Sequence, residues 1–132
     1  MSLIGEYEVE AAICSGAINK GAGVRYTGGF SADMYPLVIA VTSGIIHGVA
    51  GSLGADGDQI NIYPVGSNAR VAVVAAITDL NIPLKITTGG YFTPVTTDKD
   101  TYCLIPKQLS ASGTAGTPSF IEAVVAPGYY AV

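Results

Sequence analysis

The sequence predicts an all-β protein: a single small β-barrel or sandwich of about nine or ten short strands, with at most one short helical turn. Val and Ile number 26 against seven Leu, and Thr adds 11 more. β-Branched side chains are stiff and pack well on a pleated sheet. Strong helix formers are scarce, with four Glu, four Lys and two Gln, while 17 Gly and seven Pro predict frequent turns.

The first strand is expected over residues 6–13. Carboxylates occupy one face of this segment and Tyr7, Val9 and Ala11 the other, which is the period-two pattern of a half-buried strand. The next segments, rich in Val, Ile and Tyr and bounded by Gly and Asp turns, predict strands at 24–26, 36–42, 45–50, 58–65, 69–77, 84–87, 91–93, 101–105 and 120–125.

Three of these segments carry a more specific expectation. The run 36–42 is apolar throughout, so we expect a strand covered on both faces. Gly89-Gly90 lies between two short strand segments and predicts a hairpin. Residues 78–81 are the one plausible helical turn.

A chain of 132 residues supports one domain. We expect residues 1–15 to form an N-terminal arm or first strand, and residues 16–132 to form the β-domain, with a loop at 106–118 rich in Ser, Gly, Ala and Thr. No long internal repeat is evident.

The charge pattern excludes several partners. Only 12% of residues are charged, the net charge is −4, and the six Lys and Arg are scattered, so no phosphate-binding stripe can form and nucleic acid is not the expected partner. The uncharged stretch 34–55 is long enough to cross a membrane, but it contains Pro36, His47 and four Gly. Two short buried strands fit it better, and no membrane partner is expected.

The N-terminus lacks a basic segment followed by an apolar run, so we see no signal peptide and expect folding in a cytoplasm. In that compartment Cys14 and Cys103 are expected to be reduced and buried, although a disulfide is possible if their strands are neighbours.

The chain offers little for catalysis. Its one histidine, His47, lies in an apolar segment and is expected to be packed or interfacial. The residues from Asp56 to Asn61 resemble the start of a calcium loop, but Ile60 stands where an oxygen ligand belongs and Ser67 stands where a Glu belongs, so they predict a polar turn. We therefore expect no enzyme activity, no cofactor and no metal. The protein is expected to make or hold surfaces.

The order of these features resembles the capsid decoration, or cement, proteins of tailed bacteriophages, small β-rich proteins on the outside of an icosahedral head. The resemblance covers most of residues 16–128 as a pattern of strands and glycines, and it is carried by 17–24, 46–50, 55–60, 70–74, 83–94 and 121–128. The loop 106–118 and the Tyr-rich C-terminus depart from the pattern.

The resemblance implies a structural role: the protein binds the outer capsid surface, bridges neighbouring major capsid subunits as a homotrimer and stabilises the head. Many identical sites make modest affinity per copy sufficient. It would be made in the host cytoplasm and end on the virion.

Two segments are candidates for these contacts. The arm 2–10 is a hypothesis for strand addition to a capsid sheet edge, through Leu3, Ile4, Tyr7 and Val9, and an ordinary first strand is the alternative. The apolar C-terminus suggests Tyr129 and Tyr130 as oligomer contacts. Two further functions stay open: another virion module of tail, neck or baseplate, and a carbohydrate- or receptor-binding β-sandwich.

Overall fold

The computed structural model describes residues 9–96, 100–114 and 116–129. These residues form ten strands and one 3₁₀ turn, η1 (Thr88–Gly90). The strands are β1 (Glu10–Cys14), β2 (Gly23–Phe30), β3 (Pro36–Ala40), β4 (Gly48–Ala50), β5 (Gln59–Pro64), β6 (Asn68–Val73), β7 (Leu84–Ile86), β8 (Phe92–Pro94), β9 (Thr101–Pro106) and β10 (Ser119–Tyr129). The predicted all-β class, the number of short strands and the upper limit of one helical turn are confirmed for the described residues.

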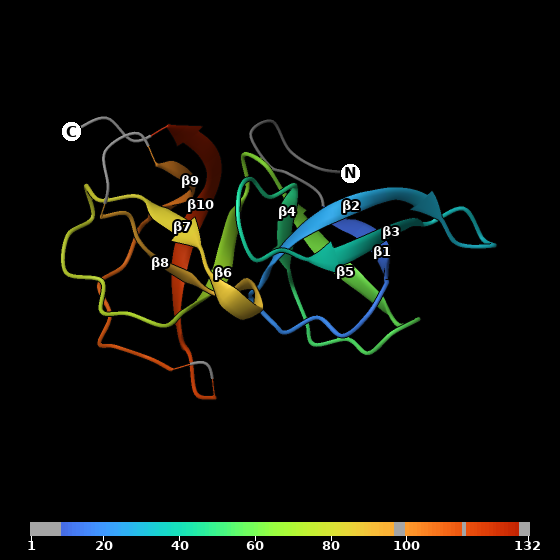
Figure 1. Cartoon of the computed structure of the whole chain (residues 1–132), viewed down its shortest axis with the longest axis horizontal. Coiled ribbons are helices and arrows are strands. Elements are labelled where there is room, and N and C mark those ends of the chain that lie inside the picture. The colour runs from blue at the N-terminus through green and yellow to red at the C-terminus, as the bar shows by residue number, and fades with distance from the viewer. Residues whose placement is uncertain (1–8, 97–99, 115, 130–132) are drawn as a thin grey trace.

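The strands close into two small barrels that lie side by side (Figure 1). The first barrel has the strand order β1-β3-β2-β4-β5, and the second has β10-β6-β8-β7-β9. Closure removes the open edges that would otherwise pair with other chains. Short strands of three to eleven residues suffice because each barrel is only five strands around.

The two barrels have the same topology. β1 pairs in parallel with β3 and antiparallel with β5, as β6 pairs in parallel with β8 and antiparallel with β10. The registers also agree, since Ala12 faces Ile60 in the first barrel and Val71 faces Ile121 at the equivalent place in the second. The chain is therefore an internal repeat, and the expectation that it has none was wrong.

The two copies of the repeat share a few identical residues. Isolated bridges join Ile18 to Gly54 in the first barrel and Ile77 to Ser110 in the second. Around them the two copies share Ala-Ile at 17–18 and 76–77, and Leu-x-Ala-x-Gly at 53–57 and 109–113. Elsewhere equivalent positions share little beyond apolar or charged character, which is why the repeat was not visible in the sequence.

Each barrel has its own apolar core, and the core of the second also takes in side chains of the first. The apolar cluster inside the second barrel includes Val41, Ile46 and Val49 of the first barrel, with exposed fractions of 3%, 1% and 0%. Gly23, in β2, permits this approach, because a Cβ there would meet the buried side chains of Ile86 and Ile46. The amide of Ala72 also donates to the Gly21 carbonyl at 3.0 Å.

Three local predictions need correction. In β1 the buried side chains are Ala12 and Cys14, on the same alternation as Glu10, so the expected inward face of Val9 and Ala11 was wrong. The run 36–42 is not covered on both faces, since Ile39 is 38% exposed. Both errors have one cause: a small barrel buries only alternate residues, and the parity depends on which neighbours close the ring.

The third correction concerns the helical turn. Residues 78–81 form a turn held by the Asp79 carboxylate, which accepts from the Asn81 amide at 2.8 Å. The 3₁₀ turn instead closes the β7–β8 hairpin, where Gly89 and Gly90 have φ of 81° and 83°. Only glycine adopts such angles without strain. The hairpin expected at Gly89-Gly90 is confirmed, and its turn type follows from the two glycines.

Candidate functional site

The residues predicted to make contacts lie at the ends of the described chain. Val9 precedes β1 and is 42% exposed. Leu3, Ile4 and Tyr7 lie outside the described residues. Tyr129 ends β10, where its backbone pairs with Thr101, and Tyr130 lies outside the described residues. The contact roles of all six remain predictions.

A chain of polar contacts fastens β1 to β2 beside this N-terminal segment. The Tyr26 hydroxyl donates to Glu10 Oε2 at 2.5 Å, and the Tyr26 ring stacks on His47 at 5.4 Å between ring centroids. Burial, and next the hydrogen bond to Glu10, raise the pKa of Tyr26 to about 12. The Tyr26 amide donates to His47 Nδ1 at 3.0 Å. His47 was predicted to be packed or interfacial, and it is half-buried against Tyr26.

Arg25 holds the loop between β3 and β4. Its guanidinium donates to the Ile45 carbonyl from Nε and Nη2, at 3.2 and 2.7 Å, and from Nη2 to the Ser43 carbonyl at 3.0 Å. The equivalent residue of the second barrel is Lys85, because Arg25 faces Ile39 as Lys85 faces Thr93 in matching hairpins. In each barrel, a cation at the same strand position therefore contacts the loop that crosses over to the barrel's fourth strand.

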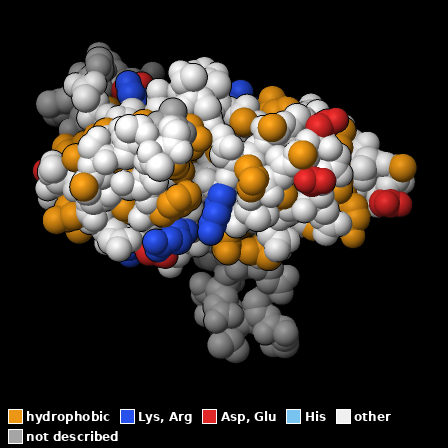
Figure 2. Space-filling view, turned by 90° about the horizontal axis from the view of Figure 1, so that it is seen from below, with side chains coloured by type: hydrophobic (Ala, Val, Ile, Leu, Met, Phe, Trp, Pro, Cys, Tyr) orange, Lys and Arg blue, Asp and Glu red, His pale blue; other side chains and the backbone are white. Residues whose placement is uncertain are grey.

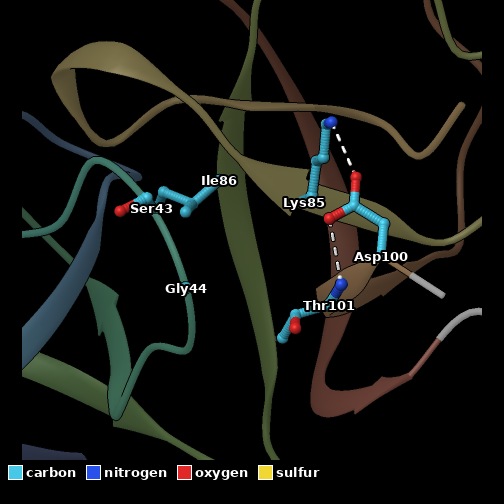
Figure 3. A pocket seen from close by; sticks show the side chains of 6 residues that line it. All are labelled: Ser43, Gly44, Lys85, Ile86, Asp100 and Thr101. Carbon is cyan, nitrogen blue, oxygen red and sulfur yellow. Dashed lines mark hydrogen bonds and ion pairs between the residues drawn. The ribbon is translucent and has the colours of Figure 1, made fainter. Parts of the chain in front are cut away.

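A small polar cavity of about 220 Å³ opens where the two barrels meet (Figure 3). It is lined by Ser43, Gly44, Lys85, Ile86, Asp100 and Thr101. The Lys85 ammonium donates to Asp100 Oδ2 at 2.7 Å, and this contact is the first cause that holds the pKa of Asp100 below its ordinary value. Ligand sites usually enclose about 300 Å³ or more, and the two charges here already satisfy each other. The cavity suits a few water molecules.

Both thiols are buried and unpaired, as predicted. Cys14 lies in β1 and Cys103 in β9, so they belong to different barrels. The Cys103 thiol donates to the Gly44 carbonyl at 3.3 Å, and burial raises its pKa to about 11. Near neutral pH this thiol is protonated, and a protonated thiol is a poor nucleophile.

The acidic turn at Asp56 and Asp58 is the polar turn that was predicted. Asp56 Oδ1 accepts from the Gly16 amide at 2.8 Å, and Asp58 Oδ2 accepts from the Ala55 amide at 2.9 Å. Within the described part of the chain, no three His, Cys, Asp or Glu side chains gather in a way that could hold a metal ion. The same residues contain no helix of the length and apolar character that crossing a membrane requires.

Three exposed apolar side chains gather on a feature that the sequence analysis missed, the turn of the β2–β3 hairpin. Phe30 is 58% exposed, Met34 is 71% exposed and Tyr35 is 38% exposed. A signal was present in the sequence, since Phe, Met and Tyr between Gly-Gly and Pro are unusual for a turn. The stretch was instead assigned to the start of an uncharged apolar run.

Comparison with known proteins identifies a shared fold. The structure matches the N base of the head fiber protein gp8.5 of bacteriophage phi29, with a TM-score of 0.67 and 16% sequence identity over 90% of this chain and 93% of that one. No protein-family model matches the sequence, and no curated protein sequence matches it. At this identity the likeness concerns the fold, and it covers both barrels.

Proposed function

We propose that this protein is a structural component of a tailed-phage virion that binds the outer surface of the icosahedral head. There it bridges neighbouring major capsid subunits as a homotrimer and stabilises the shell. The observation that carries the proposal is the fold shared, over almost the full length of both chains, with the base of a phage head fiber.

The internal repeat supports a bridging role. Two barrels of one topology lie side by side, each with its own surface side chains. A capsid shell presents many copies of one subunit, so a protein built of two joined barrels suits contact with two neighbouring copies. The first-barrel side chains packed in the second core and the hydrogen bond from the Ala72 amide to the Gly21 carbonyl would hold the two barrels at a set spacing.

The chemistry of the described residues is consistent with a binding protein. The junction cavity pairs its own charges, the one histidine is packed on Tyr26, and Cys103 is kept protonated by burial. A shell protein needs buried interface rather than reactive groups. The N-terminal arm remains our proposed strand-addition segment.

Immunogold electron microscopy of particles from the source culture tests the proposal, with antibody raised against the recombinant protein. We expect label spread evenly over the heads. Particles treated with antibody that has been absorbed with the recombinant protein provide the control. Label confined to tails would support a tail, neck or baseplate module instead, and particles without label would favour the carbohydrate- or receptor-binding alternative.

A further inference from the structure

The β2–β3 hairpin extends beyond the ring of the first barrel. β2 pairs with β4 only at Gly23 and Val24, and β3 pairs with β1 only at Leu37 and Val38. The residues between Tyr26 and Leu37 therefore have only each other as strand partners, and they project from the end of the molecule away from the second barrel (Figure 1).

The repeat shows that this extension is not needed to close a barrel. Tyr26 faces Val38 across the hairpin, and Ile86 faces Phe92 at the equivalent place in the second barrel. Residues 27–37 make the connection in the first barrel, whereas the shorter segment 87–91 makes it in the second. The second barrel closes with the same registers and without a projection.

The tip of the hairpin, which we define as residues 30–35, is ordered by its own hydrogen bonds. The Ser31 amide donates to the Tyr35 carbonyl at 2.8 Å, and the Met34 amide donates to the Ser31 carbonyl at 2.9 Å. The Tyr35 amide donates to the Ser31 hydroxyl at 3.2 Å. A tip held in this way loses little conformational freedom when it binds a partner.

Met34 carries two costs that nothing in the described structure offsets. Its φ is 68°, the one positive φ of a described residue other than glycine, and its long apolar side chain is 71% exposed. Glycine or asparagine would adopt this backbone more easily. Strained backbone that is not required by the fold is concentrated at functional sites.

The charge around the tip restricts what it can bind. From Tyr26 to Ala69 the chain has no Lys or Arg, and its charged residues there are Asp33, Asp56 and Asp58. Figure 2 shows acidic side chains toward the hairpin end and the Lys and Arg side chains at the junction and over the second barrel. Two tips in symmetric contact would bring their Asp33 carboxylates together, and an anionic surface such as nucleic acid would be repelled.

We propose that the tip of this hairpin docks in an apolar depression of the major capsid subunit that is bordered by Lys or Arg. Phe30 and Met34 enter the depression, and Asp33 pairs with the basic border. The inference rests on the proposed function, because that function supplies the partner. It adds a contact separate from the N-terminal arm.

Binding of variants to capsids that lack the protein tests this inference, by co-sedimentation. We expect Met34→Asn to raise the apparent dissociation constant about tenfold or more, since an exposed apolar anchor is lost. The melting temperature should be equal to or above that of wild type, because asparagine tolerates the left-handed backbone. Leu109→Asn is the matched control: Leu109 is 59% exposed, on the second barrel, and its variant should bind as wild type does.

Each outcome has one meaning. Equal binding by Met34→Asn and wild type overturns the hairpin inference alone, whereas failure of wild type to co-sediment overturns the proposed function from which it starts. A photo-crosslinking residue at position 34 should yield a product with the capsid subunit. A product with a second copy of this chain would instead make the hairpin an oligomer contact and overturn the inference.

Discussion

At the scale of single residues, the space around a side chain matters more for the packing of the two barrels than its chemical type. Gly23 is buried at the place where β2 meets the second barrel, and a Cβ there would lie 2.7 Å from Ile46 Cγ2 and 3.0 Å from Phe92 Cζ. Ile46 and Phe92 are 1% and 0% exposed, so neither can move without displacing its own neighbours. The sequence shows a glycine at this position but not what lies against it.

We expect Gly23→Ala to lower the free energy of unfolding by about 1–3 kcal/mol, which is the usual cost of overpacking a core. Urea denaturation measures this change. Gly116→Ala is the matched control, because the nearest atom to its added Cβ is 4.0 Å away, and it should be close to neutral. A neutral Gly23→Ala variant would show that the two barrels can separate to accept a methyl group.

Ionisation of the Tyr26 hydroxyl makes the protein less stable at alkaline pH. Its pKa is about 12 in the folded protein against an ordinary value of 10.0. Between these values the folded protein keeps a proton that the unfolded chain has lost, so the free energy of unfolding falls as the pH rises. Below the ordinary value this contribution is fully present.

We therefore expect Tyr26→Phe to lose less stability than wild type as the pH rises from 10 to 12, in urea denaturation at a series of pH values. Tyr35→Phe, at a tyrosine that is 38% exposed, is the control and should follow wild type. If Tyr26→Phe keeps the wild-type slope, folding does not raise the pKa of Tyr26.

At the scale of elements, the two barrels carry different cations at the same strand position, Arg25 in the first and Lys85 in the second. Arg25 reaches two carbonyls of its crossover loop, while Lys85 reaches the Asp100 carboxylate at the start of β9. The planar fork of arginine can donate to several acceptors, which a lysine ammonium cannot match in geometry. Strand segments were predicted well from local patterns, but the loops depend on these long-range contacts.

We expect Arg25→Lys to loosen the loop before β4 without unfolding the barrel. The His47 amide, which donates to the Val24 carbonyl at 2.8 Å, should exchange its hydrogen about tenfold faster than in wild type. Arg70→Lys is the control, since Arg70 is more than half exposed and only approaches Glu122 at 3.7 Å. Native-state hydrogen exchange distinguishes these results, and unchanged exchange at His47 would contradict the role of Arg25.

At the scale of the whole molecule, the two barrels are packed against each other. The core of the second barrel is completed by side chains of the first. The side-chain amide of Asn19 also donates to the Tyr91 hydroxyl at 3.1 Å across the junction. Equal topology in the two halves therefore does not make them independent.

We expect a single thermal transition whose calorimetric and van't Hoff enthalpies agree, because the core of the second barrel includes side chains of the first and is incomplete when the first barrel unfolds. A fragment of residues 66–132 should lack cooperative unfolding, since it lacks Val41, Ile46 and Val49. Two separate transitions, or a folded fragment, would contradict this dependence.

The class of structure and most of its strand segments follow from the sequence, because β-branched residues, alternation and turn residues act locally. The alternation of Ile60 and Ile62, both buried, against Gln59 and Asn61 was predicted correctly. The two buried, unpaired thiols were predicted from the expected cytoplasmic compartment, and the packing of His47 was predicted from the apolar character of its own segment as one of two alternatives.

The pairing of the strands, their closure into two barrels of one topology, and the burial of Ala12 and Cys14 in β1 could be seen only in the folded molecule. The same is true of the exposure of Phe30 and Met34, which point away from any core. The physical reason is that burial depends on partners distant in sequence. An apolar residue looks the same in the sequence whether it packs against another strand of its own chain or stays exposed on the surface.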